Sequence, residues 1–63
     1  MTWGELTRLL ERHGWREERT GKGSHVLLTH PARQAAIWVS RHSKREVGRG
    51  LARQVMKDAG IDR

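Results

Sequence analysis

The chain has 63 residues, with 13 lysines and arginines against 7 aspartates and glutamates, which gives a formal net charge of +6. This length allows one domain at most, so it excludes a two-domain enzyme and a large cofactor-binding fold. Cysteine is absent, which excludes disulfides, thiolate zinc sites and a cysteine nucleophile. No apolar run approaches the ~18 residues of a membrane span, and no signal-peptide pattern opens the chain. We therefore expect one soluble cytoplasmic domain over residues 1–63, with no membrane partner.

The first predicted element is an amphipathic helix over residues 3–13. Thr2 and Glu5 have the spacing of a capping box, in which each side chain accepts a hydrogen bond from the backbone of the other residue. Gly14 favours the end of the helix, because glycine adopts the left-handed conformation readily. The apolar stripe of this helix comprises Trp3, Leu6, Leu9 and Leu10.

Three short strands are predicted next, over residues 15–20, 24–29 and 35–40. The glycines of residues 21–23 favour a tight reversal between the first two strands, and Pro31 lies in the loop before the third. Trp15 is expected to be the aromatic anchor of an exposed edge strand, which another chain could pair with.

A second amphipathic helix is predicted to start near Gly48 and to end at Gly60. Its apolar residues recur at four-residue steps, and Ile61 is expected to pack back on the last turn. The stripe comprises Val47, Leu51, Val55 and Ala59.

These elements predict an α+β fold in the order α-β-β-β-α, with a three-stranded antiparallel sheet and two helices packed on one face. This is the architecture of the double-stranded-RNA-binding domain, in which the start of the second helix and the turns at one end of the sheet contact phosphates. The helix residues expected in the core are Trp3, Leu6, Leu10, Leu51 and Val55.

The basic charge is concentrated near the predicted start of the second helix. Residues 32–63 carry eight basic and three acidic side chains, whereas residues 1–31 carry five and four. Between Arg41 and Arg53 there are five cations and only one carboxylate, Glu46. This distribution favours a track for RNA phosphates over a merely solvated surface, because helix N-termini also attract phosphate.

Two of the four histidines are candidate functional residues. His25 opens the second strand directly after the basic turn, and His42 lies in the basic connection as a second proton-transfer group or a phosphate contact. His13 is expected to interact with the end of the first helix, and His30 to be solvated in a loop.

The residue types present favour chemistry without a metal ion or another cofactor. No two histidines have zinc-ligand spacing, and no carboxylate cluster would hold Mg²⁺. Ser24 and His25 are neighbours on a strand and point to opposite faces, which argues against a serine hydrolase. RNA cleavage needs less, because the RNA supplies its 2′-hydroxyl as nucleophile and the protein supplies a base and cations.

Motifs over nearly the whole chain resemble the HicA family of bacterial toxins, which are mRNA interferases of type II toxin–antitoxin systems. The chain departs from the family pattern at Val26, where many members have a histidine or a polar residue, and at residues 48–51, where many have Gly-Thr-Leu. The matching segments are Leu9 to Trp15, Gly23-Ser24-His25, His30-Pro31 and the tail from His42 to Ile61.

The resemblance implies a metal-independent endoribonuclease with a fold like that of the double-stranded-RNA-binding domain. It implies that His25 is the catalytic residue, that mRNA is cleaved without the ribosome, and that a HicB-type antitoxin neutralises the toxin. We expect the RNA to be held by Lys22, Gly23, Ser24, His42, Lys44, Arg45, Arg49 and Arg53.

Two other interpretations stay open from the residues alone. A non-catalytic RNA-binding module of the same fold explains the charge and the architecture but gives His25 no role. A small protein-interaction domain, whose basic face meets an acidic partner, explains the charge alone.

Overall fold

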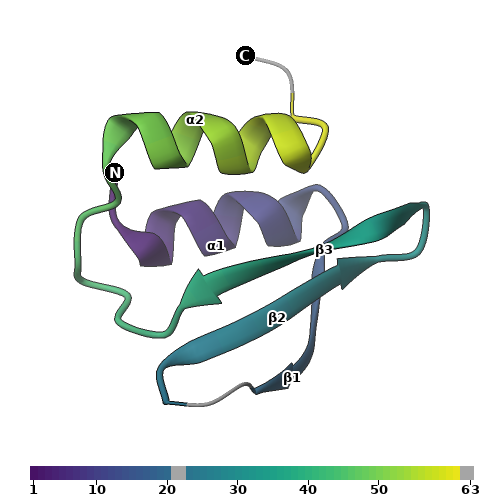
Figure 1. The fold of residues 1–63 in the computed structure, drawn as a ribbon, viewed down its shortest axis with the longest axis horizontal. Helices are drawn as coiled ribbons and strands as arrows, with labels where there is room; N and C mark the ends of the chain where they lie inside the picture. Colours follow the sequence, from purple (N-terminus) through teal and green to yellow (C-terminus); the bar gives the residue numbers. More distant parts are fainter. Residues whose placement is uncertain (21–22, 62–63) are drawn as a thin grey trace.

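The computed structural model describes residues 1–20 and 23–61, and it has the predicted order of elements (Figure 1). The α+β prediction with a three-stranded antiparallel sheet is therefore confirmed. In the predicted turn over residues 21–23, Gly21 and Lys22 lie outside the described residues. The elements are α1 (Trp3–Arg12), β1 (Arg16–Thr20), β2 (His25–His30), β3 (Arg33–Ser40) and α2 (Arg49–Asp58).

The sheet has the strand order β1-β2-β3, with β2 in the centre and antiparallel to both neighbours. Val26 pairs with Val39 and Leu28 pairs with Ile37, and all four side chains are buried. Because paired residues share a face and successive residues alternate, these pairs define the inner face of the sheet. The opposite face, which we call the open face, carries the alternate residues of β2 and β3.

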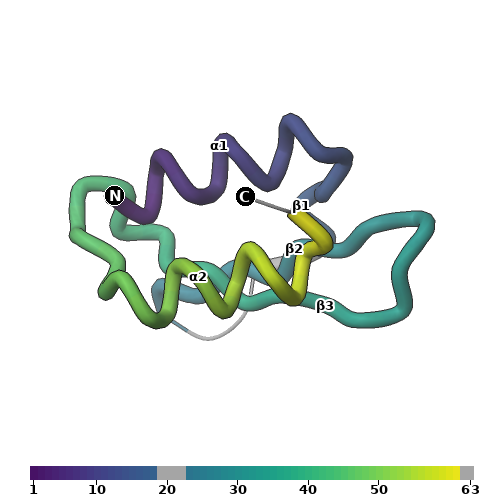
Figure 2. Tube along the Cα trace, turned by 90° about the horizontal axis from the view of Figure 1, so that it is seen from above, coloured from purple at the N-terminus to yellow at the C-terminus, as the bar shows by residue number. Residues whose placement is uncertain are grey.

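Both helices contribute to the core on the inner face. Figures 1 and 2 show that α1 and α2 run in the same direction, so both helices start at the same end of the molecule. Leu6 and Leu10 of α1 are completely buried against the sheet residues, and α2 adds Ala52 and Val55. The predicted packing of two helices against one sheet face agrees with this shared cluster.

The start of α1 has the predicted capping box. The Glu5 backbone N–H donates to the Thr2 hydroxyl at 3.1 Å, and the Thr2 backbone N–H donates to Glu5 Oε1 at 2.8 Å. At the other end, His13 Nδ1 donates to the Leu9 carbonyl at 3.0 Å, as expected of a histidine near a helix C-terminus. Gly14 follows with a φ of 97°, the left-handed conformation that favours glycine.

Trp15 is completely buried, which agrees with its predicted role as the aromatic anchor of the edge strand. It precedes β1, and its indole Nε1 donates to the carbonyl of Ala59 at the end of α2, 3.4 Å away. The ring thus joins the two helix ends across the core, a contact that sequence patterns within one segment do not indicate. β1 presents mainly charged residues, and its register with β2 shifts between Glu17 and Arg19.

Leu51 is 51% exposed, although it was predicted to be buried. The predicted stripe was counted in steps of four residues from Val47. Val47 is buried but precedes α2, so the helical periodicity does not extend from it to Leu51. Within the helix the buried residues are centred on Ala52 and Val55, and Leu51 lies roughly 70° from the middle of that stripe at 100° per residue. Of the other predicted core residues, Trp3 is only partly buried.

His30 ends β2 and is a structural residue, in contrast to the predicted solvated loop position. Its Nε2 donates to the His13 carbonyl at 2.9 Å, and its Nδ1 accepts from the Ala32 N–H at 3.0 Å. The ring also meets Trp15 edge-on, with centroids 5.3 Å apart. Both ring nitrogens are therefore occupied in holding the α1–β1 corner.

The first residues of the chain are hydrogen-bonded to the connection between β3 and α2. The Trp3 N–H donates to the Arg45 carbonyl and the Gly4 N–H to the Ser43 carbonyl, both at 2.9 Å. A Cβ on Gly4 would lie 3.0 Å from Ser43 Cβ, so the two segments approach closely. Thr2 also forms an isolated bridge with Glu46. These contacts fix the path of residues 41–47, which carry several of the predicted site residues.

Candidate functional site

His25 is the first residue of β2, and its side chain is exposed. Its cross-strand partner is Ser40, the last residue of β3. The next pair, Val26 with Val39, faces the core, so His25 and Ser40 lie on the open face. The predicted catalytic histidine is thus held at a strand end and is accessible to a large ligand.

His42 lies beside the residue that precedes His25. A hydrogen bond of 2.7 Å joins His42 Nε2 to the Ser24 hydroxyl. The backbone supports this contact, since the Arg41 N–H donates to the Ser24 carbonyl at 2.6 Å and the His42 N–H donates to the Ser40 hydroxyl at 3.1 Å. Two segments of the predicted site, which are distant in the sequence, are therefore brought together at the end of the sheet.

Gly23 is exposed and lies one residue before Ser24. Its φ is 65°, so this position needs a residue that tolerates the left-handed conformation. Ser24 is half-buried. Lys22, which was predicted to contact the phosphate, lies outside the described residues.

Lys44 and Arg45 follow His42 in the connection, and both are exposed. Residues 41–45 line an open hollow of about 340 Å³. The Arg45 N–H donates to the His42 carbonyl at 3.0 Å, which turns the chain and places both cations beside the histidine. We call Gly23, Ser24, His25, His42, Lys44 and Arg45 the sheet-end cluster.

Arg49 and Arg53 lie on α2 and line a different hollow, of about 530 Å³, together with Met1 and Met56. None of the residues that line this hollow also lines the hollow at His42. Figure 1 shows that the start of β2, the 41–48 connection and the first turn of α2 lie at the same side of the molecule. The predicted RNA-binding residues therefore form two basic areas, the sheet-end cluster and the pair on α2.

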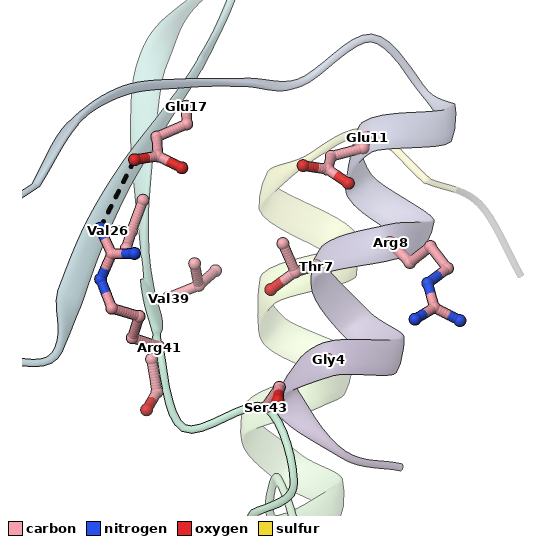
Figure 3. Close-up of a pocket in the computed structure, with 10 residues that line it drawn as sticks. Gly4, Thr7, Arg8, Glu11, Glu17, Val26, Val39, Arg41 and Ser43 are labelled. Atoms are coloured by element: carbon pink, nitrogen blue, oxygen red, sulfur yellow. Dashed lines mark ion pairs between the residues drawn. The ribbon is translucent and has the colours of Figure 1, made fainter.

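A third hollow, of about 270 Å³, separates α1 from the sheet (Figure 3). Thr7 and Glu11 of α1 face Glu17 and Arg41 across it, and the Arg41 guanidinium lies 3.5 Å from the Glu17 carboxylate. Two glutamates and two arginines line this hollow, so its formal charges balance, unlike those of the sheet-end cluster.

Sequence reasoning did not identify Ser40 as part of the site. Its hydroxyl holds the His42 backbone, and its Cα is the cross-strand partner of His25. Its place at the end of the third predicted strand could have pointed to it. The pairing of this strand with the second one, which brings Ser40 to His25, cannot be predicted from the sequence of either strand alone. Within the described ranges no group of three histidine, aspartate or glutamate side chains is placed to hold a metal ion.

Among the residues that the structure describes, the carboxyl group of Glu5 has a pKa displaced from its ordinary value by its surroundings. Hydrogen bonds from the Thr2 backbone N–H and hydroxyl hold the pKa of Glu5 below its ordinary value. This residue belongs to the cap of α1 and not to the sheet-end cluster. Over residues 1–20 and 23–61, no helix is long and apolar enough to cross a membrane.

Comparisons with known proteins identify one family. The model of the HicA toxin of bacterial toxin–antitoxin systems matches residues 3–61. A chain in the solved structure of a HicA3 and HicB3 toxin–antitoxin complex is 38% identical, with a TM-score of 0.79. The match covers 98% of this chain and 97% of the other. None of the curated proteins matches the sequence.

Proposed function

The chain belongs to the HicA toxin family, and from this premise we propose that it is a metal-independent endoribonuclease that cleaves mRNA. The observation that supports this proposal most strongly is the contact between Ser24 and His42 beside the exposed His25. Ser24 precedes His25 in the chain and Ser40 pairs with it across the strands, so two imidazoles and two hydroxyl groups lie at one end of the sheet. The same cluster carries cations and is open to a polymer.

His25 acts as the general base in this proposal. It accepts the proton of the RNA 2′-hydroxyl, and the 2′-oxygen forms a bond to phosphorus while the bond from phosphorus to the 5′-oxygen breaks. The leaving 5′-oxygen takes up a proton from water. The products are a 2′,3′-cyclic phosphate and a 5′-hydroxyl, and no metal ion or cofactor takes part. A positioned general base contributes about 10²–10⁴-fold to the rate.

His42 and Ser24 hold the scissile phosphate. Their hydrogen bond of 2.7 Å restricts the imidazole, and the Ser40 hydroxyl restricts the backbone of His42. A donor that is already oriented stabilises developing negative charge without reorganisation during the reaction. Gly23 and Lys22 contribute at the turn, where a small residue lets the RNA backbone approach.

The remaining cations bind the RNA backbone on both sides of the cleaved bond. Lys44 and Arg45 lie beside His42 and contact the nearest phosphates. Arg49 and Arg53 of α2 lie in a separate hollow, so they bind phosphates farther along the strand. No side chain caps the N-terminus of α2 at Gly48, which leaves its positive end open to phosphate.

The antitoxin of this chain is a HicB-type protein in our proposal. The similar structure is that of a HicA3 and HicB3 complex, and the two toxin chains match over nearly their full lengths. We place the toxin in the cytoplasm, where its mRNA substrate is made.

The test is cleavage of single-stranded RNA in EDTA by wild type and by His25→Ala. We expect the variant to lose cleavage while it keeps its fold and its affinity for RNA. His13→Asn is the matched control, because the His13 side chain is also exposed but hydrogen-bonds to the Leu9 carbonyl at the end of α1. Full activity of His25→Ala would overturn the catalytic assignment. RNA binding by the wild type without new 5′-hydroxyl ends would instead indicate a non-catalytic RNA-binding module.

A further inference from the structure

Trp38 is the most exposed of the three tryptophans, with 49% of its surface accessible. Trp15 is completely buried and its indole nitrogen donates to the Ala59 carbonyl, and Trp3 packs partly against the core. The other two rings therefore contribute to the fold. Trp38 leaves a large aromatic surface in water. Single exposed apolar side chains are common in proteins, so exposure alone does not indicate a function, and the position of Trp38 on the sheet is the stronger evidence.

Trp38 lies directly next to the sheet-end cluster on the open face. It is the cross-strand partner of Leu27, and the next pair on the same face is Ser40 with His25. Trp38 and His25 are therefore diagonal neighbours on one face of the two strands, a separation of about 7–8 Å that an aromatic side chain can span. Leu27, the partner of Trp38 on the neighbouring strand, is only 9% exposed.

The electrostatics of this face suit a polyanion. No aspartate or glutamate occurs between His25 and Ser40, the span of β2, the loop and β3. The chain as a whole has a net charge of +6. A single-stranded RNA can therefore cross these two strands without meeting a carboxylate of either.

We propose that Trp38 is a stacking platform for an unpaired nucleobase that flanks the scissile phosphate. The inference rests on the proposed RNA cleavage at His25 and adds a base-binding position to it. Aromatic rings bind bases of single strands through their faces, with little dependence on base identity. The stacked base fixes the position of the adjoining ribose, so its 2′-hydroxyl is presented to His25.

A protein partner fits this surface less well than a base does. A stable protein interface buries about 800 Å² on each partner. The apolar surface around Trp38 on the open face consists of its own ring with Ala36 on the same strand and little of Leu27. One ring between small neighbours matches the size of one base.

The experiment measures binding of a short single-stranded oligonucleotide with 2′-O-methyl riboses, which cannot be cleaved by attack of a 2′-hydroxyl. A second probe has the same sequence but lacks its central base. Wild type, Trp38→Ala, Trp38→Phe and Leu51→Ala are compared. Leu51 is a matched control because it is 51% exposed, is also apolar and lies outside the sheet.

We expect Trp38→Ala to weaken binding of the intact probe by roughly 5- to 100-fold, the range that loss of one base–aromatic stack gives. Trp38→Phe should keep most of the affinity, and Leu51→Ala should bind as the wild type does. The wild type should lose affinity for the probe that lacks the base, whereas Trp38→Ala should lose little more. Quenching of indole fluorescence by the intact probe should disappear in Trp38→Phe, which retains Trp3 and Trp15.

Equal affinity of folded Trp38→Ala and wild type for the intact probe would overturn the proposal. So would a loss of binding to a HicB-type antitoxin with unchanged binding to RNA, because the face would then be a protein interface. The binding readout does not depend on catalysis. If the wild type binds through Trp38 but makes no 5′-hydroxyl ends, the stacking proposal holds and the nuclease proposal fails.

Discussion

The Ser24 hydroxyl lies 2.7 Å from Nε2 of His42, although the two residues are 18 positions apart in the sequence. The contact joins the residue before the proposed base to the basic connection after β3. It makes one site from two segments, each of which contains only a fragment of the required chemistry. The arrangement of the site residues therefore depends on the register of β2 and β3, which places Ser40 opposite His25.

Ser24→Ala should reduce RNA cleavage without a large loss of stability. The substitution frees the imidazole of His42, and a typical hydrogen bond contributes only about 0.5–1.5 kcal/mol to folding. We expect kcat/KM to fall by up to about 10²-fold, the lower end of the range for loss of one preorganised donor to the developing charge. The double variant Ser24→Ala with His42→Asn should have nearly the same kcat/KM as His42→Asn alone, because each substitution removes the same hydrogen bond. Strictly additive effects would show that the two residues act independently.

Gly14→Ala should destabilise the fold, whereas Gly50→Ala should not. Gly14 has a φ of 97°, and an added Cβ would lie 2.7 Å from His30 Nε2. We expect a loss of about 1–3 kcal/mol from backbone strain, with a further cost from displacing His30. Gly50 lies in α2 with open space around it, so alanine there should add up to about 1 kcal/mol of stability. Chemical denaturation of both variants measures the difference, and equal midpoints would contradict this account.

The stability of the fold should decrease in acid in part through Glu5. Hydrogen bonds from Thr2 lower its pKa in the folded state, so the ionised carboxylate stabilises the cap of α1. This contribution is fully present above the ordinary value of 4.5 and is lost as the pH falls through the lower folded value. Urea unfolding at pH 6 and pH 3 should therefore differ less in Glu5→Gln than in the wild type. Glu18→Gln, at an exposed strand position, should keep the wild-type difference.

The two arginines of α2 should contribute to RNA affinity through charge alone. If each neutralises one phosphate of a single strand, Arg49→Ala or Arg53→Ala should lower the slope of log K against log salt by about 0.7. Arg12 is the last residue of α1, whereas Arg49 is the first residue of α2, and the two helices start at the same end of the molecule. Arg12→Ala should therefore leave the slope unchanged. Fluorescence anisotropy with a labelled oligonucleotide over a salt series gives these slopes. Unchanged slopes in both α2 variants would limit the RNA path to the sheet-end cluster.

The sequence predicted the elements well because their signals are local. The cap formed by Thr2 and Glu5, the left-handed Gly14 and the contact of His13 with the end of α1 all involve residues within a few positions of one another. The wrong predictions concerned His30 and Leu51, whose surroundings are decided by distant partners or by the place where a helix begins. Periodicity alone carries neither kind of information.

The candidate site was predicted in composition but not in arrangement. His25 and His42 were singled out from their chemistry and their neighbours, and the structure brings the second of them to Ser24. The separation of Arg49 and Arg53 from the sheet-end cluster was not foreseen, because a charge count along the chain does not reveal which side of a helix faces which surface. Ser40 and Trp38 became visible only through the pairing of β2 with β3.

The bonds from Trp3 and Gly4 to the carbonyls of Arg45 and Ser43 also bear on the order of events during translation. The first turn of α1 leaves the ribosome early, yet its partners emerge only after some forty further residues. Closing so long a loop precedes any gain from the contacts, so a nascent chain that ends at Ser40 should show no stable helical signal in circular dichroism. The backbone contacts that fix the path of residues 41–47 therefore form only after this connection has left the ribosome.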